Sequence, residues 1–141
     1  MSRNGPTILV DDDSDDLELI TQALKELQLK NTIKSFVNSL DAFDYLCKAA
    51  ENPFIILCDL NMPLQNGLEF KEQIDLDPKL REKSIPFIFY STSVDPYAVT
   101  TAYRLLTIQG YFQKGSLFSE IVDDLKVITE YWKKCRHPNS K

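Results

Sequence analysis

The sequence is poor in the residues that build disulfide frameworks and zinc sites. Its 141 residues include only three cysteines and one histidine. The cysteines, Cys47, Cys58 and Cys135, are odd in number, widely spaced and never paired as C-x-x-C, so they indicate neither disulfides nor bound zinc. Such cysteine usage fits a reducing compartment, and we expect a cytoplasmic protein.

The sequence also lacks an excess of positive charge and any long apolar stretch. It has 16 Lys and Arg against 21 Asp and Glu, a net charge of -5, whereas proteins that bind nucleic-acid phosphates usually need a clustered positive face. No apolar run approaches the roughly 18 residues that membrane insertion needs. A chain of this length is predicted to be one globular domain spanning residues 1–141, with its core at about 6–133.

What the sequence does contain is the signature of a buried strand that ends in a carboxylate. Residues 54–58 are consecutive apolar residues between Pro53 and Asp59, a run too short for a typical helix. Strands buried on both faces are typical of parallel sheets, and ligands bind beyond the carboxyl ends of such strands. Asp59 is therefore expected at the functional edge of a sheet.

Strand-like and helix-like segments alternate along the chain. Each predicted strand is followed by apolar residues at helical spacing, and the strands are expected at residues 7–10, 32–37, 54–58, 86–90 and 108–113. The helix after the fourth strand is expected at residues 96–106. This alternation predicts an α/β fold, a doubly wound five-stranded parallel sheet between two layers of helices.

Capping residues mark the predicted helix starts. We expect Asp13, Ser39 and Ser116 to cap the first, second and last helices. Asn66-Gly67 is expected to supply a left-handed turn. A structural role is predicted for three acids in the first turn of the first helix, because the helix macrodipole favours negative charge there: Asp15, Asp16 and Glu18.

Four of the predicted strands end in side chains with chemical uses: Asp11 and Asp12, Asp59, Ser91 and Lys114. Parallel strands would gather all of them at one edge of the sheet. Three carboxylates held together repel one another and imply a cation, and oxygen ligands without a neighbouring His or Cys favour Mg²⁺. A carboxylate can attack phosphorus to give an aspartyl phosphate, while a lysine and a hydroxyl stabilise the oxygens that gain charge.

At these residues the chain resembles the response-regulator receiver domains of two-component signalling. The resemblance rests on the acidic pair Asp11-Asp12, the run Asp59-Leu60-Asn61-Met62-Pro63, and the spacing from Ser91 to Lys114. It implies that Asp59 is the phosphoacceptor and that Asp11, Asp12, Asp59 and the backbone carbonyl of Asn61 hold Mg²⁺ or Mn²⁺. Ser91 and Lys114 would then contact the phosphoryl oxygens.

The same resemblance implies further roles and a topology. Ser91 and Tyr111 would be the switch residues, and Asn61 and Ser93 would flank the route of the water that removes the phosphoryl group. The strand order would be 2-1-3-4-5, which is flavodoxin-like. The chain departs from the family pattern at Gly115, which stands in place of a proline, and at Thr107-Ile108, which stands in place of Gly-Ala.

The expected function is a stand-alone regulator that receives a phosphoryl group from a histidine kinase or a phosphotransfer protein. Its only catalysis would be its own phosphorylation and dephosphorylation. With no output domain expected after the last helix, the signal would pass to an unknown downstream protein through the helix at 96–106, the fifth strand and the last helix, and homodimerisation is a further option. Direct nucleic-acid binding is not expected.

Two alternatives stay open. One is a degenerate receiver that binds partners independently of phosphorylation, suggested by Gly115 and Thr107. The other, less favoured, is a Mg²⁺-dependent phosphohydrolase of the haloacid dehalogenase type. Asp11 and Asp13 match its D-x-D spacing, but Asp15 stands where that motif needs Thr or Val.

Overall fold

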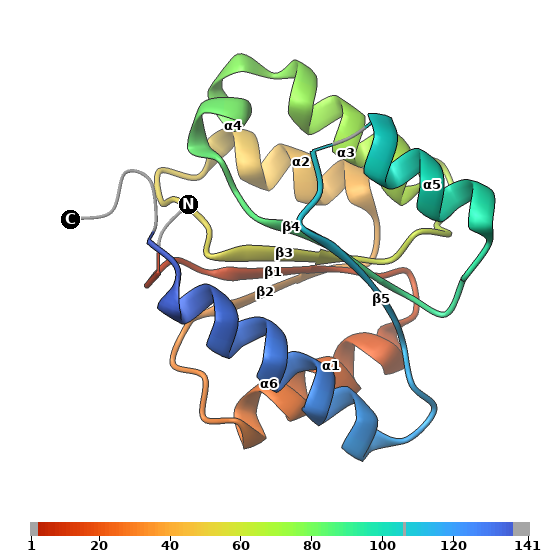
Figure 1. The fold of residues 1–141 in the computed structure, drawn as a ribbon. Helices are drawn as coiled ribbons and strands as arrows, with labels where there is room; N and C mark the ends of the chain where they lie inside the picture. The colour runs from red at the N-terminus through yellow and green to blue at the C-terminus, as the bar shows by residue number, and fades with distance from the viewer. Residues whose placement is uncertain (1–2, 106, 137–141) are drawn as a thin grey trace.

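The fold is a five-stranded sheet with helices on both faces. A computed structural model of the chain describes residues 3–105 and 107–136 (Figure 1). The elements in chain order are β1 (Thr7–Val10), α1 (Ser14–Glu26), β2 (Ile33–Phe36), α2 (Ser39–Lys48), β3 (Ile55–Cys58), α3 (Gly67–Leu76), α4 (Pro78–Lys83), β4 (Phe87–Ser91), α5 (Pro96–Leu105), β5 (Gly110–Gln113) and α6 (Phe118–Lys134). The strands are all parallel in the order β2-β1-β3-β4-β5, which confirms the predicted flavodoxin-like topology.

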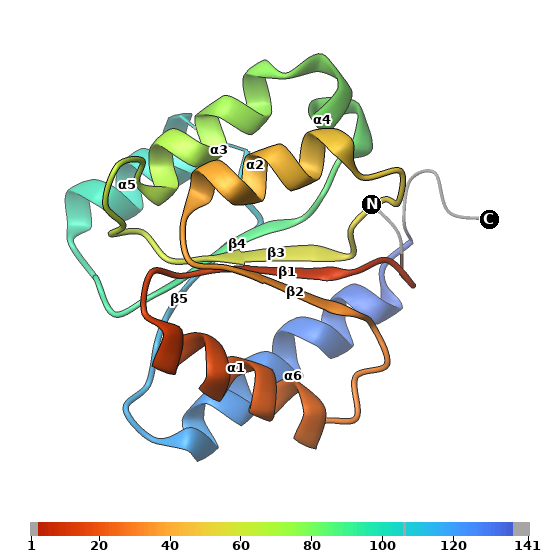
Figure 2. The same cartoon turned by 180° about the vertical axis from the view of Figure 1, so that it is seen from behind.

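The apolar strands supply two cores, one on each face of the sheet. Helices α1 and α6 cover one face and α2, α3, α4 and α5 cover the other (Figures 1 and 2). In β3, Ile56 and Cys58 pack into the core beneath α2 to α5, whereas Ile55 and Leu57 pack into the core beneath α1 and α6. Because both faces of the strand are buried, its sequence is continuously apolar rather than alternating.

The start of α2 differs from the prediction. Its N-cap is Asn38, whose side chain accepts the N–H of Asp41 at 2.8 Å, and Ser39 is the first helical residue. The Ser39 hydroxyl is buried and donates to the backbone carbonyl of Gln65 at 2.9 Å. The assignment of Ser39 as the cap was therefore wrong. Two good capping residues are adjacent here, and the preceding one, Asn38, accepts the helix N–H.

The turn predicted at Asn66-Gly67 is also different. Asn66 is the N-cap of α3, forms a capping box with Glu69, and has a φ of -77°. The left-handed residue of this loop is Leu64, with a φ of 71°. Gly67 is needed for close approach instead, because a Cβ atom there would lie 2.4 Å from the carbonyl oxygen of Asp59.

The last strand and the last helix begin later than predicted. β5 begins at Gly110 rather than at residue 108, and α6 begins at Phe118, so Ser116 is not its cap. The cap position is occupied by Leu117, whose N–H donates to the side chain of Glu120 at 3.1 Å. β2 is likewise confined to Ile33–Phe36.

The chain after α5 is tied to α3 by side chains. The described part of α5 ends at Leu105, so the predicted helix end at Leu106 lies outside the described residues. Just beyond, the Thr107 hydroxyl donates to Asp75 at 3.0 Å, and Lys71 donates to the same carboxylate at 2.7 Å. Lys71 is 4% exposed and its ammonium lies 5.5 Å from the centre of the Phe87 ring. At the position where the family pattern has glycine, this chain thus has a side-chain anchor.

The two ends of the described chain meet at the amino-terminal edge of the sheet. Arg3 donates to the carbonyl of Cys135 at 3.0 Å, and Lys133 donates to the carbonyl of Arg3 at 2.8 Å. Asn31 adds a bond to the carbonyl of Gly5 at 2.7 Å. This edge lies opposite the carboxyl ends of the strands (Figure 1). No helix among residues 3–105 and 107–136 is long and apolar enough to span a membrane.

Candidate functional site

Two aspartates directly follow the central strands β1 and β3. The N–H of Asp59 donates to the carbonyl of Val10 at 2.8 Å, and the N–H of Asp11 donates to the carbonyl of Phe36 at 3.1 Å. These bonds extend the sheet ladder one residue past the regular strands and fix both backbones. The carboxylates of Asp11, Asp12 and Asp59 consequently converge, with one oxygen of each lying within 4.8 Å of the others.

The three carboxylates differ in their environments. Asp11 is 2% exposed, Asp59 is half-buried and Asp12 is exposed. Burial raises the pKa of Asp11 to about 6, and the charge of Asp59 adds to this effect, although the hydrogen bond from Lys114 opposes it. Clustered carboxylate oxygens are the ligands that hard divalent ions prefer, so this cluster fits Mg²⁺ or Mn²⁺.

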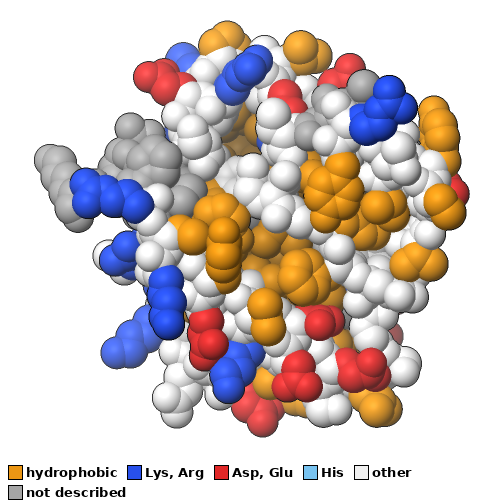
Figure 3. Space-filling view, in the orientation of Figure 1, with side chains coloured by type: hydrophobic (Ala, Val, Ile, Leu, Met, Phe, Trp, Pro, Cys, Tyr) orange, Lys and Arg blue, Asp and Glu red, His pale blue; other side chains and the backbone are white. Residues whose placement is uncertain are grey.

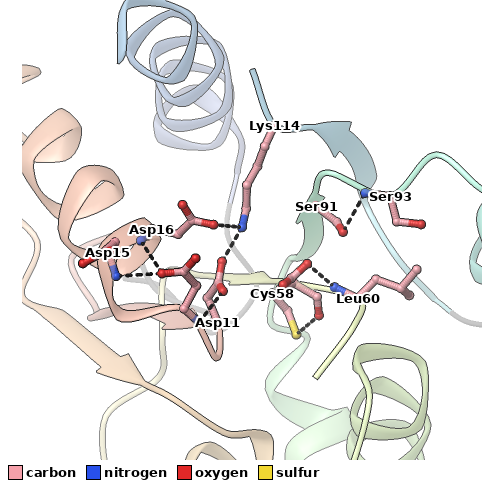
Figure 4. Close-up of polar contacts among 10 residues, drawn as sticks. Asp11, Asp15, Asp16, Cys58, Leu60, Ser91, Ser93 and Lys114 are labelled. Atoms are coloured by element: carbon pink, nitrogen blue, oxygen red, sulfur yellow. Dashed lines mark hydrogen bonds and ion pairs between the residues drawn. The ribbon is translucent and has the colours of Figure 1, made fainter. Parts of the chain in front are cut away.

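Lys114 reaches this cluster from the end of β5. Its ammonium group forms ion pairs with Asp11 and, at 3.0 Å, with Asp16, and its backbone N–H donates to the carbonyl of Ser91 at 2.8 Å (Figure 4). Burial lowers the pKa of Lys114, but the two carboxylates outweigh that effect and hold it above its usual range. Lys114 is therefore a charged donor beside the carboxylates. The Lys114–Gly115 peptide bond is trans.

Asp16 is the residue at this site that the sequence analysis missed. We expected it to act only on the helix macrodipole. Asp13 caps α1, as predicted, by accepting the N–H of Asp15 at 2.9 Å. That cap makes Asp16 the third residue of the helix, on the turn that rises from the site. An acid at the third position of a helix is commonly part of the cap alone, so no local signal in the sequence singled out Asp16.

Ser91 and Tyr111 are linked through one residue of the β4–α5 loop. Ser91 is 1% exposed, and its hydroxyl accepts the N–H of Ser93 at 3.2 Å (Figure 4). The Tyr111 hydroxyl donates to the carbonyl of Ser93 at 2.9 Å, and its ring centre lies 5.5 Å from that of Phe89. Burial raises the pKa of Tyr111, so this hydroxyl is a neutral donor. The structure thus links the two predicted switch residues through their hydrogen bonds to Ser93.

Asn61 and Cys58 flank Asp59 in different ways. Asn61 is exposed in the loop after β3, two residues beyond Asp59. Cys58 is buried, which raises the pKa of its thiol well above the usual range, and the thiol lies 3.1 Å from the carbonyl oxygen of Asp59. A buried thiol of this kind is a packing residue rather than a nucleophile.

The comparisons with known proteins agree with this geometry. The family profile of the response regulator receiver domain matches residues 7–134, so the chain belongs to that family. Response regulator Rcp1 of Synechocystis sp. (strain ATCC 27184 / PCC 6803 / Kazusa) is 27% identical over 130 residues, which cover 89% of this chain and 86% of that protein.

Solved structures share the fold over nearly the whole chain. The phosphorylated cyanobacterial phytochrome response regulator RcpA has a TM-score of 0.85 at 28% identity, covering 95% of this chain and 98% of that one. The Mn(2+)-bound form of response regulator Rcp1 has a TM-score of 0.81 at 24% identity, covering 94% and 98%. The chain is thus a two-component signalling receiver by family and by fold.

Proposed function

We propose that this receiver takes a phosphoryl group onto Asp59 from a histidine kinase or a histidine phosphotransfer protein. The observation that carries the proposal is the convergence of Asp59 with Asp11, Asp12, Lys114 and Ser91 at the carboxyl edge of the sheet. A free carboxylate oxygen of Asp59 attacks phosphorus. The new O–P bond forms as the P–N bond of the phosphohistidine breaks, and the imidazole leaves with a proton.

Each neighbouring residue has a task in this reaction. One oxygen of Asp59 accepts the N–H of Leu60 at 2.8 Å, which orients the carboxylate and leaves the second oxygen for attack. The ammonium of Lys114 and the hydroxyl of Ser91 stabilise the charge that grows on the phosphoryl oxygens. Asp11 and Asp12, with Asp59 and the backbone carbonyl of Asn61, would hold the divalent ion.

When bound, Mg²⁺ would neutralise the carboxylates and the incoming phosphoryl charge. Mn²⁺ prefers the same oxygen ligands and is the ion in the Mn(2+)-bound form of Rcp1. Of the two solved relatives, RcpA is phosphorylated.

The switch that follows phosphorylation would run through Ser93. For Ser91 to donate to a phosphoryl oxygen on Asp59, its hydroxyl has to leave the N–H of Ser93, which it now accepts at 3.2 Å. The carbonyl of the same residue accepts from Tyr111. A shift of this loop would therefore move Tyr111 together with the start of α5. A ligand shifts such an equilibrium only by its differential affinity for the two states, typically about 1–3 kcal/mol.

The surface that would change is made by α5, β5 and α6. Apolar side chains gather on this face of the molecule (Figure 3). The exposed ones on and beside these elements are Val94, Tyr97, Tyr103, Leu117, Val127 and Tyr131. We propose this face as the contact for the downstream protein or for a second copy of the chain.

Intact mass measurement tests the proposed function. Incubation with Mg²⁺ and a small phosphodonor should add about 80 Da, the mass of one phosphoryl group, and the adduct should be acid-labile. Asp59→Asn and addition of a chelator should each abolish the adduct. Uptake by Asp59→Asn at the wild-type rate would contradict the assignment. If no adduct forms and no phosphate is released, a phosphorylation-independent binding module is favoured. If phosphate is released continuously, a phosphohydrolase is favoured.

The lifetime of the adduct tests the roles of Asn61 and Ser93. Both residues lie two positions beyond a reacting residue, on loops at the carboxyl edge of the sheet. Bulky or acidic side chains at Ser93 or Asn61 are expected to change the rate of self-dephosphorylation by altering the approach of water. An unchanged decay rate across several such variants would remove these two positions from the proposal.

A further inference from the structure

Lys114 has a second acidic partner that the proposed reaction does not yet use. Its ammonium group is held between Asp11, from the end of β1, and Asp16, from the first turn of α1 (Figure 4). The Lys114 side chain is 6% exposed and that of Asp16 is 34% exposed. Two carboxylates thus share one lysine at the mouth of the site.

Both oxygens of Asp11 are already engaged in this arrangement. One accepts the N–H of Asp13 at 3.0 Å, and the other accepts from Lys114. A divalent ion among Asp11, Asp12 and Asp59 would need an oxygen of Asp11 and would also repel the ammonium group. Ion binding would therefore weaken the contact between Asp11 and Lys114, although Lys114 is needed for the phosphoryl group.

Asp16 is placed to hold Lys114 through that exchange. It is not part of the three-carboxylate cluster, so an ion bound there leaves its contact with Lys114 intact. Its position is fixed independently, because Asp13 caps α1 by accepting the N–H groups of Asp15 and Asp16. An ammonium group has three donors, so Lys114 can keep Asp16 and still donate to a phosphoryl oxygen.

We propose that Asp16 is a positioning residue that keeps the ammonium group of Lys114 at the phosphorylation site when Asp11 turns to the divalent ion. The inference rests on the proposed function of Asp59 and names a further residue for it. It predicts that neutralising Asp16 impairs the reaction through Lys114, whereas neutralising Asp15 does not. Asp15 is the matched control because it carries the same charge in the same helical turn but is exposed and turned away from Lys114 (Figure 4).

The first test compares phosphorylation by a small phosphodonor at saturating Mg²⁺. Asp16→Asn should react roughly tenfold more slowly than wild type, the effect of losing one charge-assisted hydrogen bond. Its half-saturating Mg²⁺ concentration should change by less than about twofold, because Asp16 does not bind the ion. Asp16→Glu should recover most of the rate, and Asp15→Asn should behave as wild type. Equal rates for Asp16→Asn and Asp15→Asn would overturn the inference.

The second test observes Lys114 itself. The protein is labelled with ¹⁵N-lysine, and the NMR signal of the Lys114 ammonium group is assigned by its loss in Lys114→Arg. In the presence of Mg²⁺ this signal should persist in wild type and in Asp15→Asn. It should be lost in Asp16→Asn. Persistence in Asp16→Asn would contradict the inference. If wild type takes up no phosphoryl group, the function proposed for Asp59 fails, and this signal still decides separately whether Asp16 holds Lys114.

Discussion

The carboxylate of Asp75 accepts the hydroxyl hydrogen of Thr107 at 3.0 Å, across 32 residues of sequence. This bond joins α3 to the segment that connects α5 to β5. Both α5 and β5 belong to the face proposed to carry the signal. A glycine at this position would remove the anchor to α3 and leave the Gln109 side chain, which accepts the N–H of Phe87 at 2.6 Å, to hold the segment. Thr107 therefore limits how far the end of α5 can move unless Asp75 moves with it.

Removing the Thr107 hydroxyl should loosen this connection. Thr107→Val keeps the side-chain shape and removes one hydrogen bond to a carboxylate, so we expect a loss of about 1 kcal/mol in the free energy of unfolding. Urea unfolding measures the loss. Thr100→Val, on the exposed face of α5, is the control and should be close to neutral. Equal stability of the two variants would show that the bond does not contribute.

Lys71 is the other partner of Asp75 and is almost fully buried. Lys71→Met leaves the Asp75 carboxylate with Thr107 as its remaining partner. We expect the free energy of unfolding to fall by about 2–3 kcal/mol. This loss is smaller than for a fully buried ion pair because the Asp75 side chain is 21% exposed. The double variant Lys71→Met/Asp75→Asn removes the unpaired charge and should be more stable than Lys71→Met. A double variant less stable than the single one would mean that packing, not charge, dominates at this site.

Replacing Asp12 in the carboxylate cluster should change stability in opposite directions with and without a divalent ion. In a chelator, Asp12→Asn relieves repulsion and should raise the thermal unfolding temperature. At Mg²⁺ concentrations about 100 times the dissociation constant, wild type should gain about 2.7 kcal/mol from binding, and Asp12→Asn should gain much less. Calorimetry in both conditions checks this. The same Mg²⁺-induced gain in both proteins would exclude Asp12 from the ion site.

The bond between Tyr90 and Asp124 gives a pH-dependent prediction. The Tyr90 hydroxyl donates to Asp124 at 3.0 Å. Burial raises the pKa of Asp124 and the bond from Tyr90 lowers it. A raised carboxyl pKa contributes stability that is present below the unfolded pKa and is lost as the pH rises through the folded pKa. Tyr90→Phe raises this pKa further, so its deficit relative to wild type should grow with pH.

Urea unfolding at about pH 3, below the ordinary pKa of an aspartate, and at about pH 7 tests that sign. At the higher pH we expect Tyr90→Phe to be less stable than wild type by about 1 kcal/mol, with a smaller difference at the lower pH. Tyr131→Phe, an exposed tyrosine on α6, should show no pH-dependent difference. If the stability deficit of Tyr90→Phe shrinks as the pH rises, the predicted sign is wrong.

The topology and the convergence of Asp11 with Asp59 could be predicted because they depend on periodicity and on the common direction of parallel strands. The capping errors at Ser39 and Ser116 have a different cause. Residue type alone does not choose between adjacent candidates, and at Leu117 the cap contact comes from the side chain of Glu120. Asp16 required the direction of α1 relative to β5, which no local pattern of the sequence contains.

The contact between Arg3 and Cys135 also makes the chain a candidate for circular permutation. Because these residues are joined by a hydrogen bond of 3.0 Å at the edge opposite the carboxylates, a short linker from Cys135 to Arg3 would span little distance. New ends could then be opened in the exposed loop at Leu64, which is 86% exposed, while every strand keeps its neighbours. A reporter fused directly at Arg3 or Cys135 would, for the same reason, be attached at the edge of the sheet opposite Asp59.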